Sequence, residues 1–152
     1  MTGTGQRGTL QRMDNVAVVV DDLDAAKAFF TELGMELEGE ATLEGSVVDR
    51  LIGLDAVLTD IAMMRTPDGS GRIELTKYHR PASPSGDQLV PVYALGAHRV
   101  MFAVTDIQDV VGRLEPHGAE LLGDIVSYEN SHRLAYLRGP GGIVLALAEQ
   151  LT

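Results

Sequence analysis

Few side chains in this sequence could act as nucleophiles or bind a metal ion. The 152 residues include no cysteine and four histidines. The chain therefore has no thiolate nucleophile, no disulfide and no cysteine-bound zinc, and a metal ion would need His, Asp, Glu or other oxygen ligands. The dinucleotide-binding, Walker, His-Glu-x-x-His and Gly-x-Ser-x-Gly motifs are all missing. The glycine-rich residues 138–142 fit a hairpin turn better than a phosphate cradle, because no helical pattern follows them.

The histidines differ in what their positions predict. We expect His79 and His117 at exposed loop or helix-end positions, without a chemical role. His132 and Tyr128 lie near a predicted loop and could close over a ligand.

The charge balance excludes two classes of partner. Lys and Arg number 12 against 22 Asp and Glu, and the formal charge of −10 would repel nucleic-acid phosphates and anionic lipids. No apolar run approaches the roughly 20 residues of a membrane span, and residues 1–12 contain no stretch typical of a signal peptide. We therefore expect a cytoplasmic protein. Its length and its 45% hydrophobic content suit one compact domain.

The elements that must position any site come from an internal repeat with a constant offset of 84 residues. Residues 15–23 match residues 99–107, and the match continues without a gap. The matched pairs are Asp22 with Asp106, Leu23 with Ile107, Phe30 with Leu114, Gly34 with Gly118, Leu37 with Leu121 and Gly39 with Gly123.

Each copy of the repeat predicts a strand followed by a helix. The copies begin with a Val-rich or otherwise apolar run, which predicts a buried strand, and continue with apolar residues at helical spacing. Thr105 and Gln108 fit a capping box at the start of the second helix. Gly34 and Gly118 stand where a left-handed C-cap is expected.

The second halves of the copies complete a βαβββ unit. Residues 62–69 correspond to residues 135–142 as a strand entering a Pro/Gly turn, and residues 73–75 correspond to residues 145–147 as the closing strand. The sequence thus predicts an α+β fold of two paired βαβββ modules. The expected boundaries are a tail at 1–12 and one domain at 13–152, with module one at about 13–77, a connector at about 78–96 and module two at about 97–150.

The order of these motifs resembles the vicinal oxygen chelate superfamily, which includes glyoxalase I, bleomycin-resistance proteins, fosfomycin-resistance enzymes and extradiol dioxygenases. The resemblance covers about residues 13–150. It implies that the sheets of the two modules curl around a central cavity. The motifs that carry it are residues 14–24, residues 65–69 leading to 73–75, residues 100–106 and residues 136–142.

The resemblance also identifies four positions where metal-dependent members place a ligand. They fall on Asn15, Glu74, Arg99 and Ala146, where such relatives typically have His or Gln, Glu, His and Glu. Only Glu74 matches. Asn is a poor neutral ligand, Arg carries a repelling charge and Ala has no donor atom, so we expect no metal cofactor.

Two interpretations of the altered site stay open. Glu74 and Arg99 could form an ion pair that simply fills the cavity. Alternatively, Arg99 binds a carboxylate, enolate or phenolate oxygen while Glu74 accepts a proton or orients the ligand, which makes these two the catalytic residues. The substrate-binding residues would then be Asn15, Met64, Met101, His132 and Tyr136.

The resemblance therefore favours a metal-independent protein that binds, and in one version transforms, a small organic molecule between its modules. A homodimer fits the bleomycin-resistance branch. One alternative is a metal-dependent lyase, isomerase or dioxygenase of the glyoxalase kind, with a disfavoured metal site of Glu74 and either His98 or His132. Another is a noncatalytic regulatory or partner subunit.

Overall fold

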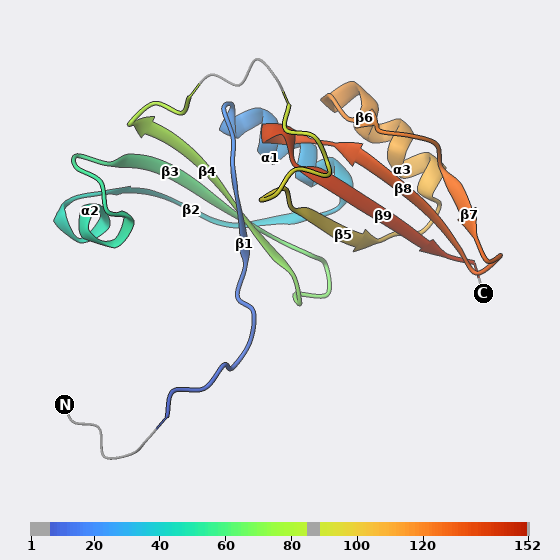
Figure 1. The fold of residues 1–152 in the computed structure, drawn as a ribbon, viewed down its shortest axis with the longest axis horizontal. Helices are drawn as coiled ribbons and strands as arrows, with labels where there is room; N and C mark the ends of the chain where they lie inside the picture. The colour runs from blue at the N-terminus through green and yellow to red at the C-terminus, as the bar shows by residue number, and fades with distance from the viewer. Residues whose placement is uncertain (1–6, 85–88, 152) are drawn as a thin grey trace.

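The computed structural model describes residues 7–84 and 89–151, and the first half of this part forms one sheet with a helix on it. The strands lie in the order β1-β4-β3-β2, with β1 parallel to β4 and the other neighbours antiparallel (Figure 1). The elements are β1 (Val16–Val19), α1 (Leu23–Leu33), β2 (Glu36–Glu44), α2 (Ser46–Ile52), β3 (Leu58–Arg65) and β4 (Arg72–Arg80).

The second half repeats this arrangement. Its strands lie in the order β5-β9-β8-β6, with β7 also paired to β8, and β5 runs parallel to β9. Two 3-10 turns, Glu115–His117 and Pro140–Gly142, follow α3 and β8. The other elements are β5 (Arg99–Ala103), α3 (Ile107–Leu114), β6 (Glu120–Leu121), β7 (Val126–Tyr128), β8 (His132–Arg138) and β9 (Val144–Gln150).

The strand register confirms the predicted repeat. Ala17 of β1 is opposite Glu74 of β4, and Met101 of β5 is opposite Ala146 of β9. Since Ala17 and Met101 are 84 residues apart, Glu74 and Ala146 occupy equivalent positions in the two modules. The predicted α+β fold of two βαβββ modules is therefore confirmed, with β4 running on to Arg80 so that the connector begins later than expected.

Both glycines predicted at the helix ends, Gly34 and Gly118, lie there in the structure with positive φ. Asp22 caps α1, because its carboxylate accepts a hydrogen bond from the Ala25 N–H at 3.0 Å, and Gly34 ends that helix at φ 123°. Gly118 closes the turn after α3 in the left-handed region. The predicted capping box at Thr105 is wrong, since Asp106 is the N-cap of α3 and accepts from the Asp109 N–H.

Helix α2 is an element that the sequence did not predict. None of its residues is buried, so it lacks the apolar stripe by which an amphipathic helix is recognised. Asp49 holds the chain that leaves it, because its carboxylate accepts hydrogen bonds from the Val57 N–H at 2.8 Å and the Ala56 N–H at 3.1 Å.

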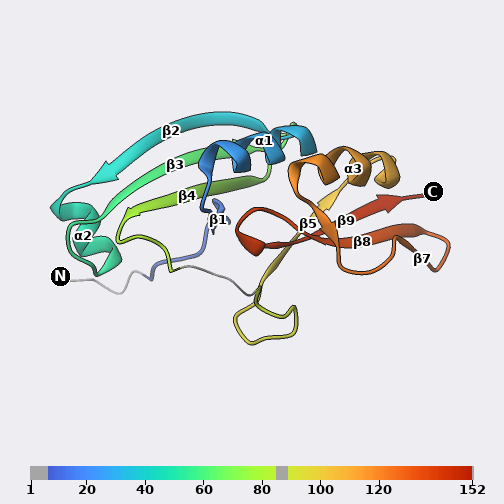
Figure 2. The same cartoon turned by 90° about the horizontal axis from the view of Figure 1, so that it is seen from above.

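One hydrophobic core runs through both modules. Phe29 and Phe30 of α1 are fully buried with their rings edge to face, 5.2 Å apart. Helices α1 and α3 lie side by side in Figure 2, and the two sheets extend from them in opposite directions. The core continues into the second module through Ile107, Val110, Val111, Leu114, Ala135, Leu137, Leu145 and Leu147.

The two sheets stay separate and are not closed into a barrel. The turn between β8 and β9 lies directly against β1 instead. Gly141 is at φ 70°, and a Cβ atom on it would be 2.3 Å from the Val19 carbonyl oxygen. Arg138 fixes the same turn by donating to the Gly142 and Val90 carbonyl oxygens at 2.9 and 2.6 Å. This contact sets how the modules are placed within the chain.

No helix in the described part of the chain is long and apolar enough to cross a membrane. The cytoplasmic location stays a prediction.

The turn between β3 and β4 gives a pH-dependent contribution to stability. The Thr66 hydroxyl and then the Ser70 N–H donate to the Asp68 carboxylate, which lowers the pKa of Asp68 from 3.8 to about 2. Because this pKa is lower in the folded chain, the stabilisation is complete above the unfolded-state value and is lost as the pH falls towards about 2.

We expect Thr66→Val to raise the pKa of Asp68 and to flatten the fall in unfolding free energy between about pH 4 and pH 2. NMR titration of the Asp68 carboxyl and urea unfolding at several pH values measure the two effects. An unchanged Asp68 titration in the variant would contradict the assignment.

Candidate functional site

The first part of the candidate site lies on the face of the first sheet that is turned away from α1, here called the first open face. Glu74 is half-buried there and stands between Ala17 of β1 and Met63 of β3. Asn15 directly precedes β1 on the same face and is exposed. Within the described residues, the carboxylate of Glu74 has no hydrogen bond or ion pair.

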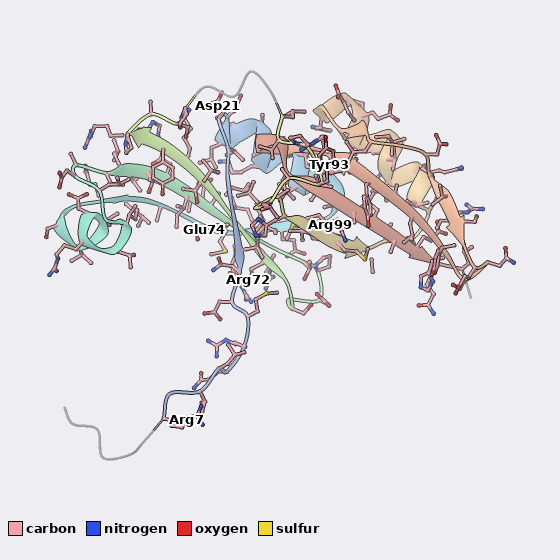
Figure 3. All side chains as sticks on the ribbon, in the orientation of Figure 1. Arg7, Asp21, Arg72, Glu74, Tyr93 and Arg99 are labelled. Carbon is pink, nitrogen blue, oxygen red and sulfur yellow. The ribbon has the colours of Figure 1, made fainter. Side chains whose placement is uncertain are left out.

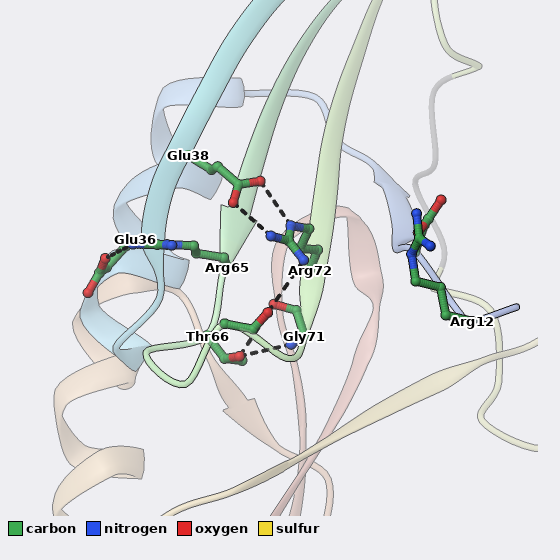
Figure 4. A network of polar contacts seen from close by, with 9 residues as sticks. Arg12, Glu36, Glu38, Arg65, Thr66, Gly71 and Arg72 are labelled. Atoms are coloured by element: carbon green, nitrogen blue, oxygen red, sulfur yellow. Dashed lines mark hydrogen bonds and ion pairs between the residues drawn. The ribbon is translucent and has the colours of Figure 1, made fainter.

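The other charged side chains of the first open face neutralise one another. Arg72 binds Glu38 at 2.9 Å, and Arg65 binds Glu36 at 3.1 Å (Figure 4). The hydrogen bonds from Arg72 hold the pKa of Glu38 below its usual range, so both partners stay charged near neutral pH. Among the described residues of this face, Glu74 is therefore an acid without a cationic partner.

The second part of the candidate site lies on the second open face, the face of the second sheet turned away from α3. Met101, Ala146 and Tyr136 form a row across β5, β9 and β8. The guanidinium carbon of Arg99 is 4.9 Å from the centroid of the Tyr136 ring, a cation–π contact. Arg99 is exposed, and no acidic partner is found for it in residues 7–84 and 89–151.

The structure does not bring Glu74 and Arg99 together within one chain. Glu74 lies on β4 and Arg99 begins β5, so the two residues belong to different sheets (Figure 3). The ion pairs of the described residues do not include this pair. The physical reason is the separation of the sheets, which leaves each open face uncovered.

The remaining predicted residues divide between the open faces and the core. Met64 is fully buried under α1 and does not line an open face, because strand alternation turns its neighbour Met63 outward instead. On β3 it is Met63, opposite Glu74, that lies on the first open face. His132 begins β8, with its Nδ1 2.8 Å from the Ser131 hydroxyl oxygen.

A groove of about 680 Å³ lies elsewhere, between the β3–β4 turn and strand β5. Met101 is the one predicted site residue among those that line it. Its walls come from the β3–β4 turn, β5 and α3, so it lies between the modules, and Glu74, Arg99 and Tyr136 are not among its lining residues.

The donor set at the four family positions does not fit a divalent metal ion. Asn15 and Glu74 lie on one sheet, while Arg99 adds a positive charge and Ala146 is buried without a donor atom on the other. No group of three or more His, Cys, Asp or Glu side chains in the described part could hold a metal ion. His98 and His132 do not join Glu74 in such a group.

The fold and these positions define the class of protein. The chain belongs to the glyoxalase/bleomycin resistance protein/dioxygenase superfamily, which it matches over residues 12–147.

Similar proteins span nearly the whole chain. A glyoxalase family protein from Bacillus cereus is 51% identical, with a TM-score of 0.90 over 96% of this chain and 98% of that one. The uncharacterized protein YaeR of Escherichia coli is 27% identical over 93% of this chain and 98% of its own. The fosfomycin resistance protein FosX of Listeria monocytogenes, 12% identical with a TM-score of 0.62, covers 95% of this chain and 94% of its own, and shows the fold alone.

Proposed function

We propose that the chain binds a small organic molecule through an acidic oxygen of that molecule and without a divalent metal ion. The observation that carries the proposal is the environment of the Arg99 side chain. Its guanidinium lies on the Tyr136 ring, has no acidic partner among the residues that the structure describes, and stands at a position where metal-dependent relatives have a ligand.

A guanidinium in this place suits a planar anion. It presents several N–H donors in fixed directions and pairs with carboxylate, enolate or phenolate oxygens. The Tyr136 ring holds it on one side, and Met101, 54% exposed, offers an adaptable apolar surface beside it. Together they fit a small molecule with an anionic oxygen and an apolar body.

Benzoate and catechol are suitable probes because each combines an acidic oxygen group with an aromatic body. We expect both to bind chelator-treated protein and to shift the Met101 methyl signal in NMR spectra. Arg99→Gln should weaken benzoate binding about 10- to 100-fold, as expected for loss of a charge-assisted hydrogen bond.

Arg133→Gln is the matched control. Arg133 and Tyr136 lie three residues apart on β8, so their side chains point to opposite faces of the sheet. Loss of the Arg133 charge should therefore leave benzoate binding unchanged. Binding that disappears with chelator and returns with Zn²⁺, Ni²⁺ or Mn²⁺ would contradict the proposal. So would the absence of binding by both probes.

A further inference from the structure

The groove between the modules is a cavity that the proposed function does not use. Its volume of about 680 Å³ lies within the range of small-molecule sites in proteins. The β3–β4 turn, the start of β1 and the end of α1 line it from the first module, and β5 and α3 line it from the second (Figure 1). A ligand in this groove would therefore contact both modules at once.

The floor of the groove is apolar. Phe102 and Val104 are half-buried and leave apolar surface for a ligand to cover. The side chains of the floor belong to the hydrophobic core or pack against it, so the fold fixes their positions. Among them are Val16, Ile73, Val100, Phe102, Val104 and Val110.

Both cationic side chains that line the groove are already paired. Arg72 donates two hydrogen bonds to the Glu38 carboxylate, at 2.9 and 3.0 Å. Arg113 donates to the Asp109 carboxylate at 2.9 Å and to the Glu32 carboxylate at 3.3 Å. An anionic ligand in the groove would have to compete with these carboxylates for either guanidinium.

The other two charged side chains of the lining, Asp68 and Asp106, are acids without a cationic partner in the described part of the chain. Asp68 accepts hydrogen bonds from the Thr66 hydroxyl and the Ser70 N–H, and Asp106 accepts one from the Asp109 N–H at 3.3 Å. These donors are neutral, so they leave the negative charge of each carboxylate uncompensated. Asp68 belongs to the first module and Asp106 to the second, and both are exposed at the rim. Here they are called the acidic rim.

Charge complementarity selects the occupant of the groove. An apolar floor below an acidic rim fits an organic cation with an apolar body, and it disfavours a carboxylate of the same size. The net charge of −10 acts in the same direction, because it attracts small cations to the protein and repels anions. A neutral apolar molecule would use the floor alone.

We propose that the groove between the modules binds a primary amine in its ammonium form, with the ammonium group at the acidic rim and an apolar body on the floor. The ammonium group donates hydrogen bonds to the carboxylates of Asp68 and Asp106. The body covers apolar surface around Phe102 and Val110, which removes that surface from water. The site does not depend on the function proposed above, since Arg99 and Tyr136 do not line the groove.

Three probes that share a 2-phenylethyl body test this proposal: 2-phenylethylamine, 2-phenylethanol and 3-phenylpropanoate. We expect the amine to shift the methyl signals of Val104 and Val110 in NMR spectra, and the affinity for the groove is read from these signals. The amine should bind there about 5-fold or more tightly than the neutral alcohol, and the anionic propanoate more weakly still. The preference for the amine should shrink as NaCl is added, because both carboxylates are exposed and salt screens them.

Asp68→Asn and Asp106→Asn remove one charge each and keep the local structure, since Asn also suits a turn and a helix N-cap. Each variant should bind the amine about 2- to 3-fold more weakly than the wild type. Binding of 2-phenylethanol should be unchanged, which also shows that the groove is intact. Asp124→Asn is the matched control, because Asp124 is exposed and does not line the groove.

Three results would overturn the proposal: an amine that shifts neither methyl signal, an alcohol or propanoate that binds in the groove as tightly as the amine, or rim variants that bind the amine like the wild type. The two proposals fail separately. Arg99→Gln should leave amine binding unchanged. A protein that binds the amine but neither benzoate nor catechol overturns the proposed function alone, whereas one that binds benzoate but not the amine overturns the groove site alone.

Discussion

Replacing Gly141 with alanine should lower the free energy of unfolding by about 3 kcal/mol or more. Two effects add at this position. The residue is at φ 70°, where an L-side chain is strained by roughly 1 to 2 kcal/mol. A Cβ atom would also lie 2.3 Å from the Val19 carbonyl oxygen, a main-chain atom of β1 that moves only if the strand moves.

Gly69→Ala is the control for the strain alone. Gly69 lies within the equivalent turn of the first module at φ 76°, and a Cβ atom there would meet nothing within 4 Å. We expect a loss of about 1 to 2 kcal/mol for this variant in urea unfolding. Equal losses for the two variants would show that the β8–β9 turn is not pressed against β1.

The internal repeat predicted the element order and the equivalence of Glu74 and Ala146, because both follow from local patterns. Strand alternation is a pattern of neighbouring residues, and the constant offset comes from comparing two stretches of the sequence. Neither needs knowledge of the tertiary structure. For the same reason the faces of Asn15, Arg99 and Met101 could be assigned in advance. Met63 could have been preferred to Met64 by the same rule.

The placement of the modules could not be predicted in this way. It depends on Gly141 meeting Val19, residues more than a hundred positions apart, and on Arg138 binding two carbonyl oxygens. The expectation that Glu74 and Arg99 share a cavity assumed a closed pair of modules within one chain. Helix α2 was not predicted, because it buries no side chain and so has no apolar stripe in its sequence.

Phe29→Ala should lower the free energy of unfolding by about 3 to 5 kcal/mol. The Phe29 ring is fully buried between α1 and the β8–β9 turn, where a Cβ atom on Gly139 would lie 3.3 Å from its Cζ atom. Its loss leaves a cavity at the contact that places the second module on the first.

Phe102→Ala is the matched control for that variant, because it removes the same ring from a half-buried position beside the groove. We expect a loss of about 1 to 2 kcal/mol, since less apolar surface is withdrawn from water there. Urea unfolding measures both stabilities. If Phe102→Ala proves as damaging as Phe29→Ala, the β8–β9 turn is not the contact that holds the modules in place.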